Sequence, residues 1–598
     1  MKRIFLSISL VVIGSLHGCS MLDESAKVTP AKDKPPQSES QVQKDKTGKD
    51  KKQASKSAKQ PLVKPKQPEK PESLDPELFY LLMSAEIAGQ RGQLDVAVQN
   101  YLRAAELSQD ATIAERATRI AVYGRDDKST LRAASIWVKL QPDNMEAHQV
   151  MAALLVRTGQ VDKAQFHLEK LVQASNNQQN SFMLISALLS KEKDKQNALK
   201  AMEKLVTKYS NNPEALYALS HLAYLVRSFD EAEQNILKVL SLEPDWGDAN
   251  LLYANILSRL GKHDVATRKL EDFLQRKSSA HNIRLYLARK YIDLKEFEKA
   301  RGHFQILLEQ KPDHADSMFA LGLLGMQLKK TDEAESYFLR LLELGQREND
   351  ARYYLGQMAE FNNKNDDALR WYRKVEEGNY FLEANVRIAN LIAQQGDVLA
   401  AREHLQNIAA DTAEMELQLY LAEGEILRDA QMYKEAVQLY SDGLEQLPDN
   451  IQLLYARGLT AEKLDNINQT ILDLSRIIEL EPGHTQALNA LGYTLIDQTE
   501  RIKEGFAYIR KAYSMNPDDA AIIDSMGWAY YRTGNYEEAL KYLRMAFEKL
   551  KDAEIAAHLG EVLWVMGEEE QARQIWTEAL RQKPQDKTLI NVIERFSE

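Results

Sequence analysis

The chain has 598 residues, of which 44% are hydrophobic and 28% are charged, and its formal net charge is −11. This length exceeds the roughly 100–200 residues of one compact domain, so the chain holds several domains or an array of repeats. Residues 20–73 carry 13 lysines and 8 acidic residues, whereas residues 74–598 carry 62 basic and 80 acidic ones. Such an acidic body repels a phosphate backbone, which excludes nucleic acid as the expected partner. The single cysteine excludes an intrachain disulfide and a cysteine-based zinc site.

Residues 1–18 predict a secretory signal peptide, because a basic start is followed by an apolar run at residues 4–16. A run of about 13 residues falls short of the roughly 20 that span a membrane, which argues against an uncleaved anchor helix. The sequence L-H-G-C at residues 16–19 resembles the bacterial lipobox, although His17 replaces the small residue usual at that position. This resemblance implies lipidation of Cys19. Since Ser20 stands where an aspartate would retain the protein in the inner membrane, it also implies an outer-membrane anchor facing the periplasm.

Residues 19–73 combine the lipidated cysteine with a basic linker rich in Lys, Pro, Gln and Ser. The linker has no aromatic residue, so it cannot bury enough apolar surface to offset the entropy of ordering, and we expect it to be disordered. A coil of this length spans roughly 40 Å root-mean-square. The sequence predicts a spacer that holds the body away from the lipid, and contact of its lysines with head groups or cell wall is an open alternative.

A repeat of 34 residues dominates the body. Small residues recur at this interval or within one residue of it, at Ala97, Thr130, Ala164, Ala198, Ala232, Ala266, Ala300, Ala334, Ala368, Ala401, Ala436, Thr470, Gly505, Ala539 and Ala572. A second small residue often lies twelve positions before, as at Ala254, Gly356 and Gly527, and a proline often lies twelve positions after, as at Pro142, Pro312 and Pro482. The two small residues let paired helices approach closely, and the proline ends the second helix. A generic helical bundle would not keep this register.

The period and these positions resemble the tetratricopeptide repeat (TPR) over nearly all of residues 74–598. The resemblance implies an all-α fold, a right-handed solenoid of about fifteen helical hairpins with a capping helix at residues 587–596. Two regions depart from the pattern. The unit at residues 111–139 has Trp137 where a small residue is usual. The intervals between Ala368 and Ala436 are 33 and 35, which predicts a kink or a loop bulge there.

In a TPR array, positions 2, 5, 9 and 12 of each first helix line the concave face, and this resemblance gives the candidate partner-binding groove. Aromatic rings beside amides and carboxylates suit a peptide ligand. For Tyr493, Trp528 and Tyr531 packing between repeats is an equally good interpretation. The candidate groove residues are Tyr217, His221, Tyr224, Asn255, Asn390, Asn489, Tyr493, Asp524, Trp528 and Tyr531.

The sequence contains no pattern that points to catalysis. The histidines are scattered over different repeats, no H-E-x-x-H or G-x-S-x-G motif occurs, and no glycine-rich phosphate loop is present. The repeats also leave no stretch long enough for an ordinary catalytic domain. We therefore expect no enzyme, no cofactor and no metal site.

The lipobox, the polar linker and the large repeat array together look like the outer-membrane lipoprotein adaptors of Gram-negative bacteria. Those adaptors bind a periplasmic carboxyl-terminal-processing protease and present cell-wall hydrolases to it. The resemblance implies a scaffold that holds such proteins together at the membrane surface. A TPR lipoprotein that supports exopolysaccharide export or pilus assembly is the alternative within the binding class, and a cell-wall hydrolase with an unfamiliar site is the enzymatic one.

Overall fold

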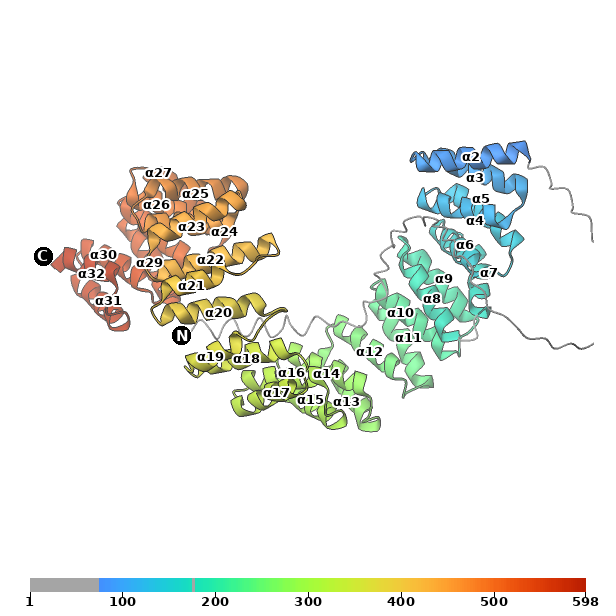
Figure 1. The fold of residues 1–598 in the computed structure, drawn as a ribbon, viewed down its shortest axis with the longest axis horizontal. Coiled ribbons are helices and arrows are strands. Elements are labelled where there is room, and N and C mark those ends of the chain that lie inside the picture. Colours follow the sequence, from blue (N-terminus) through green and yellow to red (C-terminus); the bar gives the residue numbers. More distant parts are fainter. Residues whose placement is uncertain (1–74, 175–177, 598) are drawn as a thin grey trace, which may run out of the picture. The chain divides into compact units, whose positions relative to one another are not determined.

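A computed structural model describes residues 75–174 and 178–597, and in these residues every element is an α-helix. Two compact units divide at Leu328, with unit 1 before it and unit 2 from Lys329 onward. Within each unit, successive helices pair side by side as hairpins (Figure 1). The predicted all-α hairpin fold is confirmed. The predicted signal peptide, Cys19 and the linker lie outside the described residues.

The described residues of unit 1 form fifteen helices. Their bounds are α2 Pro76–Gln90, α3 Leu94–Ser108, α4 Ala111–Tyr123, α5 Asp127–Leu140, α6 Met145–Arg157, α7 Val161–Gln173, α8 Gln178–Ser190, α9 Lys195–Thr207, α10 Pro213–Leu225, α11 Phe229–Leu242, α12 Gly247–Arg259, α13 His263–Arg276, α14 His281–Asp293, α15 Phe297–Gln310 and α16 Ala315–Gln327.

Unit 2 consists of sixteen helices. Their bounds are α17 Thr331–Glu343, α18 Glu348–Phe361, α19 Asn365–Tyr372, α20 Phe381–Gln394, α21 Val398–Gln406, α22 Ala413–Asp429, α23 Tyr433–Gln446, α24 Ile451–Glu462, α25 Ile467–Leu480, α26 Thr485–Gln498, α27 Ile502–Met515, α28 Ala520–Arg532, α29 Tyr536–Lys549, α30 Ala553–Val565, α31 Glu569–Gln582 and α32 Lys587–Ser597.

Local chemistry explains where many helices begin and end. Asp or Asn side chains cap the first helix of many hairpins, as Asn212 does for α10 and Asp519 for α28, by accepting hydrogen bonds from the first-turn amides. The predicted prolines lie two residues beyond the last residue of a second helix, as Pro244 does after α11 and Pro482 after α25. The missing amide hydrogen and the locked φ of proline stop the helix there.

The small residues of the ladder lie where two helices of a hairpin cross. Ala232, Ala300 and Ala539 are completely buried. At Gly527 a Cβ atom would lie 2.6 Å from Cγ of Leu543 in the next helix, so no larger side chain fits without displacing that helix. The hairpin of α26 and α27 differs slightly, because Gly492 faces Gly505 thirteen residues later rather than twelve. Helix α26 has 14 residues, one more than α28, whereas both hairpins have a connection of three residues.

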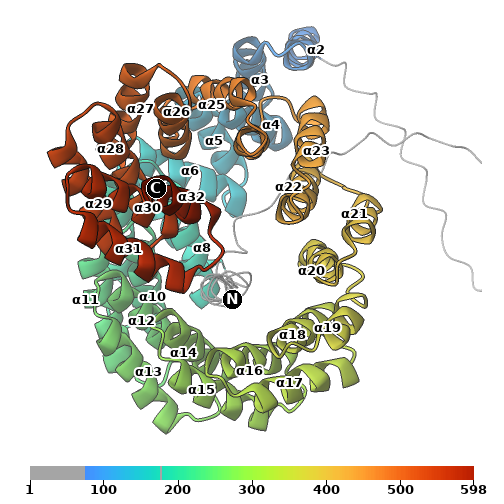
Figure 2. The same ribbon diagram turned by 90° about the vertical axis from the view of Figure 1, so that its left-hand side faces the viewer.

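The predicted irregularity between Ala368 and Ala436 is present. Helices α19 and α21 have only 8 and 9 residues, whereas most second helices have 13 to 15. Loops at residues 373–380 and 407–412 replace their last turns (Figure 2). The degenerate unit at residues 111–139 forms an ordinary hairpin of α4 and α5, because Trp137 is buried and its indole nitrogen donates to Oε1 of Gln141 at 3.0 Å.

The predicted capping helix is α32, which packs on α30 and α31. Leu589 is fully buried, and the ring of Phe596 lies 5.9 Å from Trp564 and 6.1 Å from Trp576. Burying a large apolar side chain stabilises a fold by about 1.5–3 kcal/mol. The last hairpin therefore has its outer apolar surface covered by the chain itself.

Candidate protein-binding surface

The ten candidate groove residues all lie on first helices of hairpins, namely α10, α12, α20, α26 and α28. None of them is fully exposed: Asp524 and Trp528 are buried, and the other eight are half-buried. The structure therefore places them at the junctions between neighbouring hairpins, where most of them contact residues about thirty positions away. Two groups emerge, one in each unit.

In unit 1, Tyr217 and His221 connect three consecutive first helices. The ring of Tyr217 packs on Trp246, the residue that precedes α12, with centroids 4.7 Å apart. Nδ1 of His221 lies 3.1 Å from Oγ of Ser186 on α8. Burial raises the pKa of Tyr217 to about 12, and Asp248 adds to this, while burial lowers the pKa of His221. Both side chains are thus neutral hydrogen-bonding groups at neutral pH.

Tyr224 and Asn255 continue this group along unit 1. Nε of Arg259 donates to the hydroxyl of Tyr224 at 3.5 Å, and the hydroxyl of Tyr286 donates to Oδ1 of Asn255 at 2.7 Å. Tyr286 also borders a hollow of about 290 Å³, together with Ser258 and Leu270. This part of the surface combines a concavity with hydroxyl groups, which suits a partner that inserts a side chain.

In unit 2, Asp524 on α28 forms an ion pair with His558 on α30. Nδ1 of His558 lies 2.9 Å from Oδ2 of Asp524, and both residues are buried. Burial alone lowers the pKa of His558. The charge and hydrogen bond of Asp524, with Glu554 and Asp497 nearby, more than offset this effect, and the pKa is raised. The surroundings of His558 therefore favour its charged imidazolium form.

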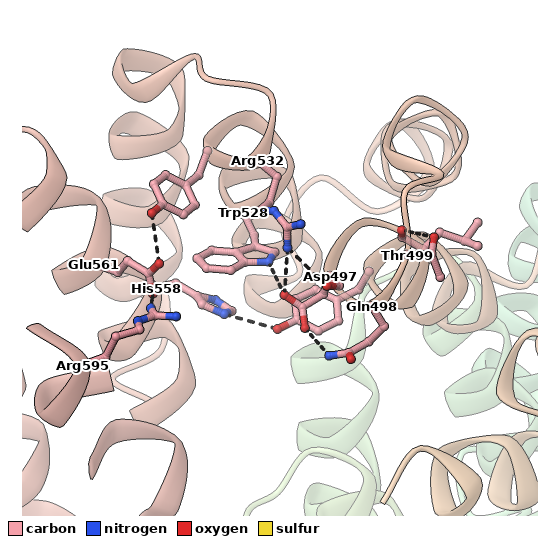
Figure 3. Close-up of polar contacts among 11 residues, drawn as sticks. Asp497, Gln498, Thr499, Trp528, Arg532, His558, Glu561 and Arg595 are labelled. Carbon is pink, nitrogen blue, oxygen red and sulfur yellow. Dashed lines mark hydrogen bonds and ion pairs between the residues drawn. The ribbon is translucent and has the colours of Figure 1, made fainter. Parts of the chain in front are cut away.

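Trp528 and Tyr493 complete the surroundings of His558, and Figure 3 shows Trp528 beside its ring. The indole of Trp528 stacks on the imidazole ring, with centroids 4.2 Å apart, and its Nε1 donates to Oδ1 of Asp497 at 3.0 Å. The hydroxyl of Tyr493 lies 3.3 Å from Nε2 of His558. Trp528 is only 7% exposed. Its side chain packs between repeats, which is one of the two interpretations that the sequence left open.

Tyr531 lies at the outer end of the same group. Its hydroxyl donates to Oε1 of Glu561 at 3.0 Å, and Glu561 also forms an ion pair with Arg595 of the capping helix. Arg532 reaches back to Asp497, with its Nη1 3.2 Å from the backbone oxygen. These contacts join α26, α28, α30 and α32 into one polar and aromatic seam (Figure 3).

The two remaining candidates are asparagines. Asn390 is half-buried on α20. Asn489 is half-buried on α26, one turn before Tyr493, and its Oδ1 is shielded from solvent without a hydrogen-bond partner in the described residues. An acceptor left without a partner costs about 1–3 kcal/mol. Asn489 is therefore the candidate whose amide has the most to gain from a peptide donor.

Unit 1 contains a second histidine group that the sequence did not suggest. Nδ1 of His148 on α6 lies 2.9 Å from Nδ1 of His167 on α7, and Nε2 of His148 lies 2.8 Å from the backbone oxygen of Pro142. A carbonyl only accepts, so Nε2 of His148 carries its proton and Nδ1 accepts from His167. Burial, followed by the charge of His148, lowers the pKa of His167 to about 4.

Sequence reasoning missed His558, Glu561, Asp497 and Arg595. A usable signal was present, because His558 lies 34 residues after Asp524, and Tyr531 lies 30 residues before Glu561. A side chain on one first helix contacts the next first helix at about one repeat period. Scanning polar residues at this offset would have found both pairs.

Neither a metal site nor a membrane span is found in the described residues. Between residues 75 and 597, apart from 175–177, no three His, Cys, Asp or Glu side chains are arranged to hold a metal ion. No helix in that part of the chain is long and apolar enough to cross a membrane.

Family models of the tetratricopeptide repeat match residues 251–315, 285–348, 330–380, 485–519 and 525–587. A TPR repeat-containing protein of Pseudomonas aeruginosa is 36% identical over 530 residues, which cover 83% of this chain and 84% of that protein. Human tetratricopeptide repeat protein 13 is 27% identical over 169 residues, 27% of this chain and 19% of that protein.

Solved structures of TPR proteins are also similar in part. A thermophilic TPR protein of Thermus thermophilus shares 22% identity with a TM-score of 0.28, covering 31% of this chain and all of that one. The Cut9–Hcn1 hetero-tetramer of the APC/C shares 15% identity with a TM-score of 0.31, covering 87% and 96%. The hairpin register, the matching family models and the Pseudomonas relative together show that this chain belongs to the tetratricopeptide-repeat family, whose members serve as scaffolds for protein–protein interaction.

Proposed function

We propose that this protein is a non-catalytic adaptor, tethered to the outer membrane through Cys19, that holds periplasmic proteins on its first-helix face. The observation that carries the proposal is the series of aromatic, amide and carboxylate side chains on the first helices α10 and α12 of unit 1 and α26 and α28 of unit 2, supported by a TPR relative that matches most of the chain. Two partners on one scaffold meet at a raised effective concentration. A tether at Cys19 would confine that meeting to the membrane surface.

The partners that we propose are a carboxyl-terminal-processing protease of the periplasm and the cell-wall hydrolases that it cleaves. Support comes from the resemblance of the lipobox, basic linker and long repeat array to adaptors of that kind. The acidic body would also attract basic wall enzymes electrostatically. The alternative is a TPR lipoprotein that supports exopolysaccharide export or pilus assembly, and it differs in partners rather than in fold or anchor.

A cross-linked pull-down from envelope extracts, with the full-length chain as bait, tests the choice of partner. We expect a processing protease together with wall hydrolases among the captured proteins. Recovery of export or pilus components without a protease would select the alternative. Hydrolysis of peptidoglycan or casein by the purified chain alone would contradict an adaptor of either kind.

The binding surface needs a variant that reverses an exposed charge of the groove, with amide hydrogen exchange of α28 and α30 checking that the seam beneath it stays folded. Glu554 is exposed on α30 close to Asp524 and His558, and burial of its surroundings raises its pKa. We expect Glu554→Lys to reduce partner capture at least tenfold. The matched control is Glu548→Lys, a change of an exposed carboxylate on the second helix α29, and equal losses in both variants would contradict the assignment of the face.

The anchor has a separate test. Mass spectrometry of the N-terminal peptide from the envelope should show an acylated Cys19, and Cys19→Ser should release the protein into the soluble fraction. An unmodified Cys19 in the mature protein would remove the membrane tether from the proposal and leave the scaffold intact.

A further inference from the structure

The first described helix, α2, exposes a run of large apolar side chains. Tyr80 is 68% exposed, Phe79 is 54% exposed, and Met83 and Ile87 are 45% and 44% exposed. At 100° per residue these four side chains share one side of the helix, opposite Leu81, Ala85 and Ala88, which are buried against α3. Isolated apolar residues on a surface are ordinary, but four on one helix face form a patch.

The positions of these residues within the repeat show which surface of the array they form. Counted from the small residue Ala85 as position 8, Tyr80, Met83 and Ile87 occupy positions 3, 6 and 10 of a first helix. The same positions are buried at the junction with the preceding hairpin elsewhere in both units, as in Ala215, Ala218 and Leu222 of α10, Ala249, Leu252 and Ile256 of α12, Ile522, Ser525 and Ala529 of α28, and Ile555, His558 and Val562 of α30. We name Tyr80, Met83 and Ile87, with Phe79, the open stacking face. It is the surface that a repeat array normally covers with another repeat.

The chemistry of the open stacking face restricts what can cover it. The residues along it are Pro76, Phe79, Tyr80, Met83, Ile87 and Gln90, and none of them is charged. The acidic residues of α2 lie beside the face, where Glu77 and Glu86 form ion pairs with Arg103 and Arg116. An uncharged, apolar stripe of this kind meets no like charge when it packs against an identical stripe, so it is complementary to itself.

The chain's own linker has little to offer this face. Residues 20–73 contain no aromatic residue and few apolar ones, of which Leu62 and Val63 are the nearest adjacent pair. Nor can the C-terminal end of another copy stack here as a continuing repeat, because α32 covers the last hairpin and Leu589 is fully buried beneath it. A head-to-tail filament is therefore blocked, and the remaining self-association joins two open ends.

We propose that the open stacking face binds a second copy of this chain, with the two α2 helices antiparallel about a two-fold axis near Met83. Four side chains of roughly 200 Å² each, about half exposed, bury about 400 Å² per copy. This gives about 800 Å² in total, below the 1,200–2,000 Å² of stable complexes, so the dimer is expected to dissociate in the micromolar range. Among the groove positions of α2, the two-fold contact covers only position 2, which is Phe79.

The test is sedimentation velocity of the full-length chain in detergent between 1 and 100 µM. We expect a monomer–dimer equilibrium, and Met83→Glu should weaken the dimer at least tenfold because it places two carboxylates together. The matched control is Leu472→Glu on α25, since Leu472 is 63% exposed and lies away from this helix in the sequence. A chain that stays monomeric at 100 µM, or equal effects of the two substitutions, would overturn the proposal.

Disulfide trapping supplies a second reading that does not depend on tolerance of a charge. Met83→Cys should form a disulfide-linked dimer on mild oxidation, whereas Leu472→Cys should not. A Met83→Cys chain that forms no more dimer than Leu472→Cys, or whose cysteine is protected from alkylation in a monomer, overturns the proposal, and protection in the monomer would point to residues 1–74 as the occupant.

Discussion

Two buried histidine groups, one in each unit, show how the same hairpin architecture gives opposite electrostatics. In unit 1, His148 and His167 bond to each other, and the other side of the His148 ring faces the backbone oxygen of Pro142. In unit 2, His558 faces Asp524 and stacks on Trp528. The pKa of His167 is lowered to about 4, whereas the pKa of His558 is raised. The fold supplies burial in both places, and the neighbouring side chain decides which protonation state it favours.

The largest expected effect comes from breaking the ion pair in unit 2. Asp524→Ala removes the counterion and a hydrogen-bond partner of the buried His558, and removing one partner of a buried pair destabilises a protein by about 3–5 kcal/mol. Amide hydrogen exchange of α28 and α30 measures the local free energy of opening. The control is Asp518→Ala, because Asp518 is 88% exposed and pairs with Lys549 at the surface. Equal effects of the two substitutions would show that the buried pair contributes no more than an exposed one.

The second expected effect is that acid destabilises the region of unit 1 around His148 and His167. His167 has a lowered pKa in the folded state, so its neutral form stabilises unit 1 fully above pH 6.5, and this stability is lost as the pH falls toward 4. We expect hydrogen exchange to show a loss of about 1–2 kcal/mol for α6 and α7 between pH 7 and pH 4.5. The double variant His148→Leu and His167→Leu should lose this dependence. Persistence of the acid effect in that variant would assign it to carboxylates elsewhere.

Raising the pH should destabilise the region of unit 2 around His558. The pKa of His558 is raised in the folded state, so its charged form stabilises the seam below pH 6.5, and that contribution is lost as the pH rises through the folded pKa. Hydrogen exchange of α28 and α30, corrected for the intrinsic rate, should show weaker protection at pH 9 than at pH 6, while α6 and α7 stay constant. The same pH dependence of protection in both regions would contradict the opposite pKa shifts of the two histidines.

The smallest expected effect comes from removing one hydrogen bond beside the candidate groove residues of each unit. Tyr531→Phe removes a bond to Glu561, and Tyr286→Phe removes a bond to Asn255. Each change should cost about 1 kcal/mol, since an intramolecular hydrogen bond contributes 0.5–1.5 kcal/mol net. Thermal unfolding followed by circular dichroism can rank the two variants. A change above 3 kcal/mol in either would indicate that the ring itself, rather than the hydroxyl, had been displaced.

Much of the site could be expected from the sequence, and some of it could not. The register placed Tyr217, Asn255 and Tyr493 on first helices, where the structure has them. Their partners lie on other hairpins, and a periodic pattern does not reveal which rotamer reaches across a junction. Trp528 illustrates the limit, because its helix position is compatible with both groove contact and packing between repeats, and its stack on His558 is visible only in the structure.

The sequence by itself determined the all-α class, the 34-residue hairpin register, the proline stops, the irregular stretch after Ala368 and the capping helix. These features follow from local rules, since small residues, prolines and apolar spacing act within one hairpin or between adjacent ones. Only the tertiary structure decided the pairing of Asp524 with His558, the bond between His148 and His167, and the open stacking face of α2. Each of these depends on which side chains of different helices pack together and which stay exposed, and that depends on three-dimensional packing rather than on spacing along the chain.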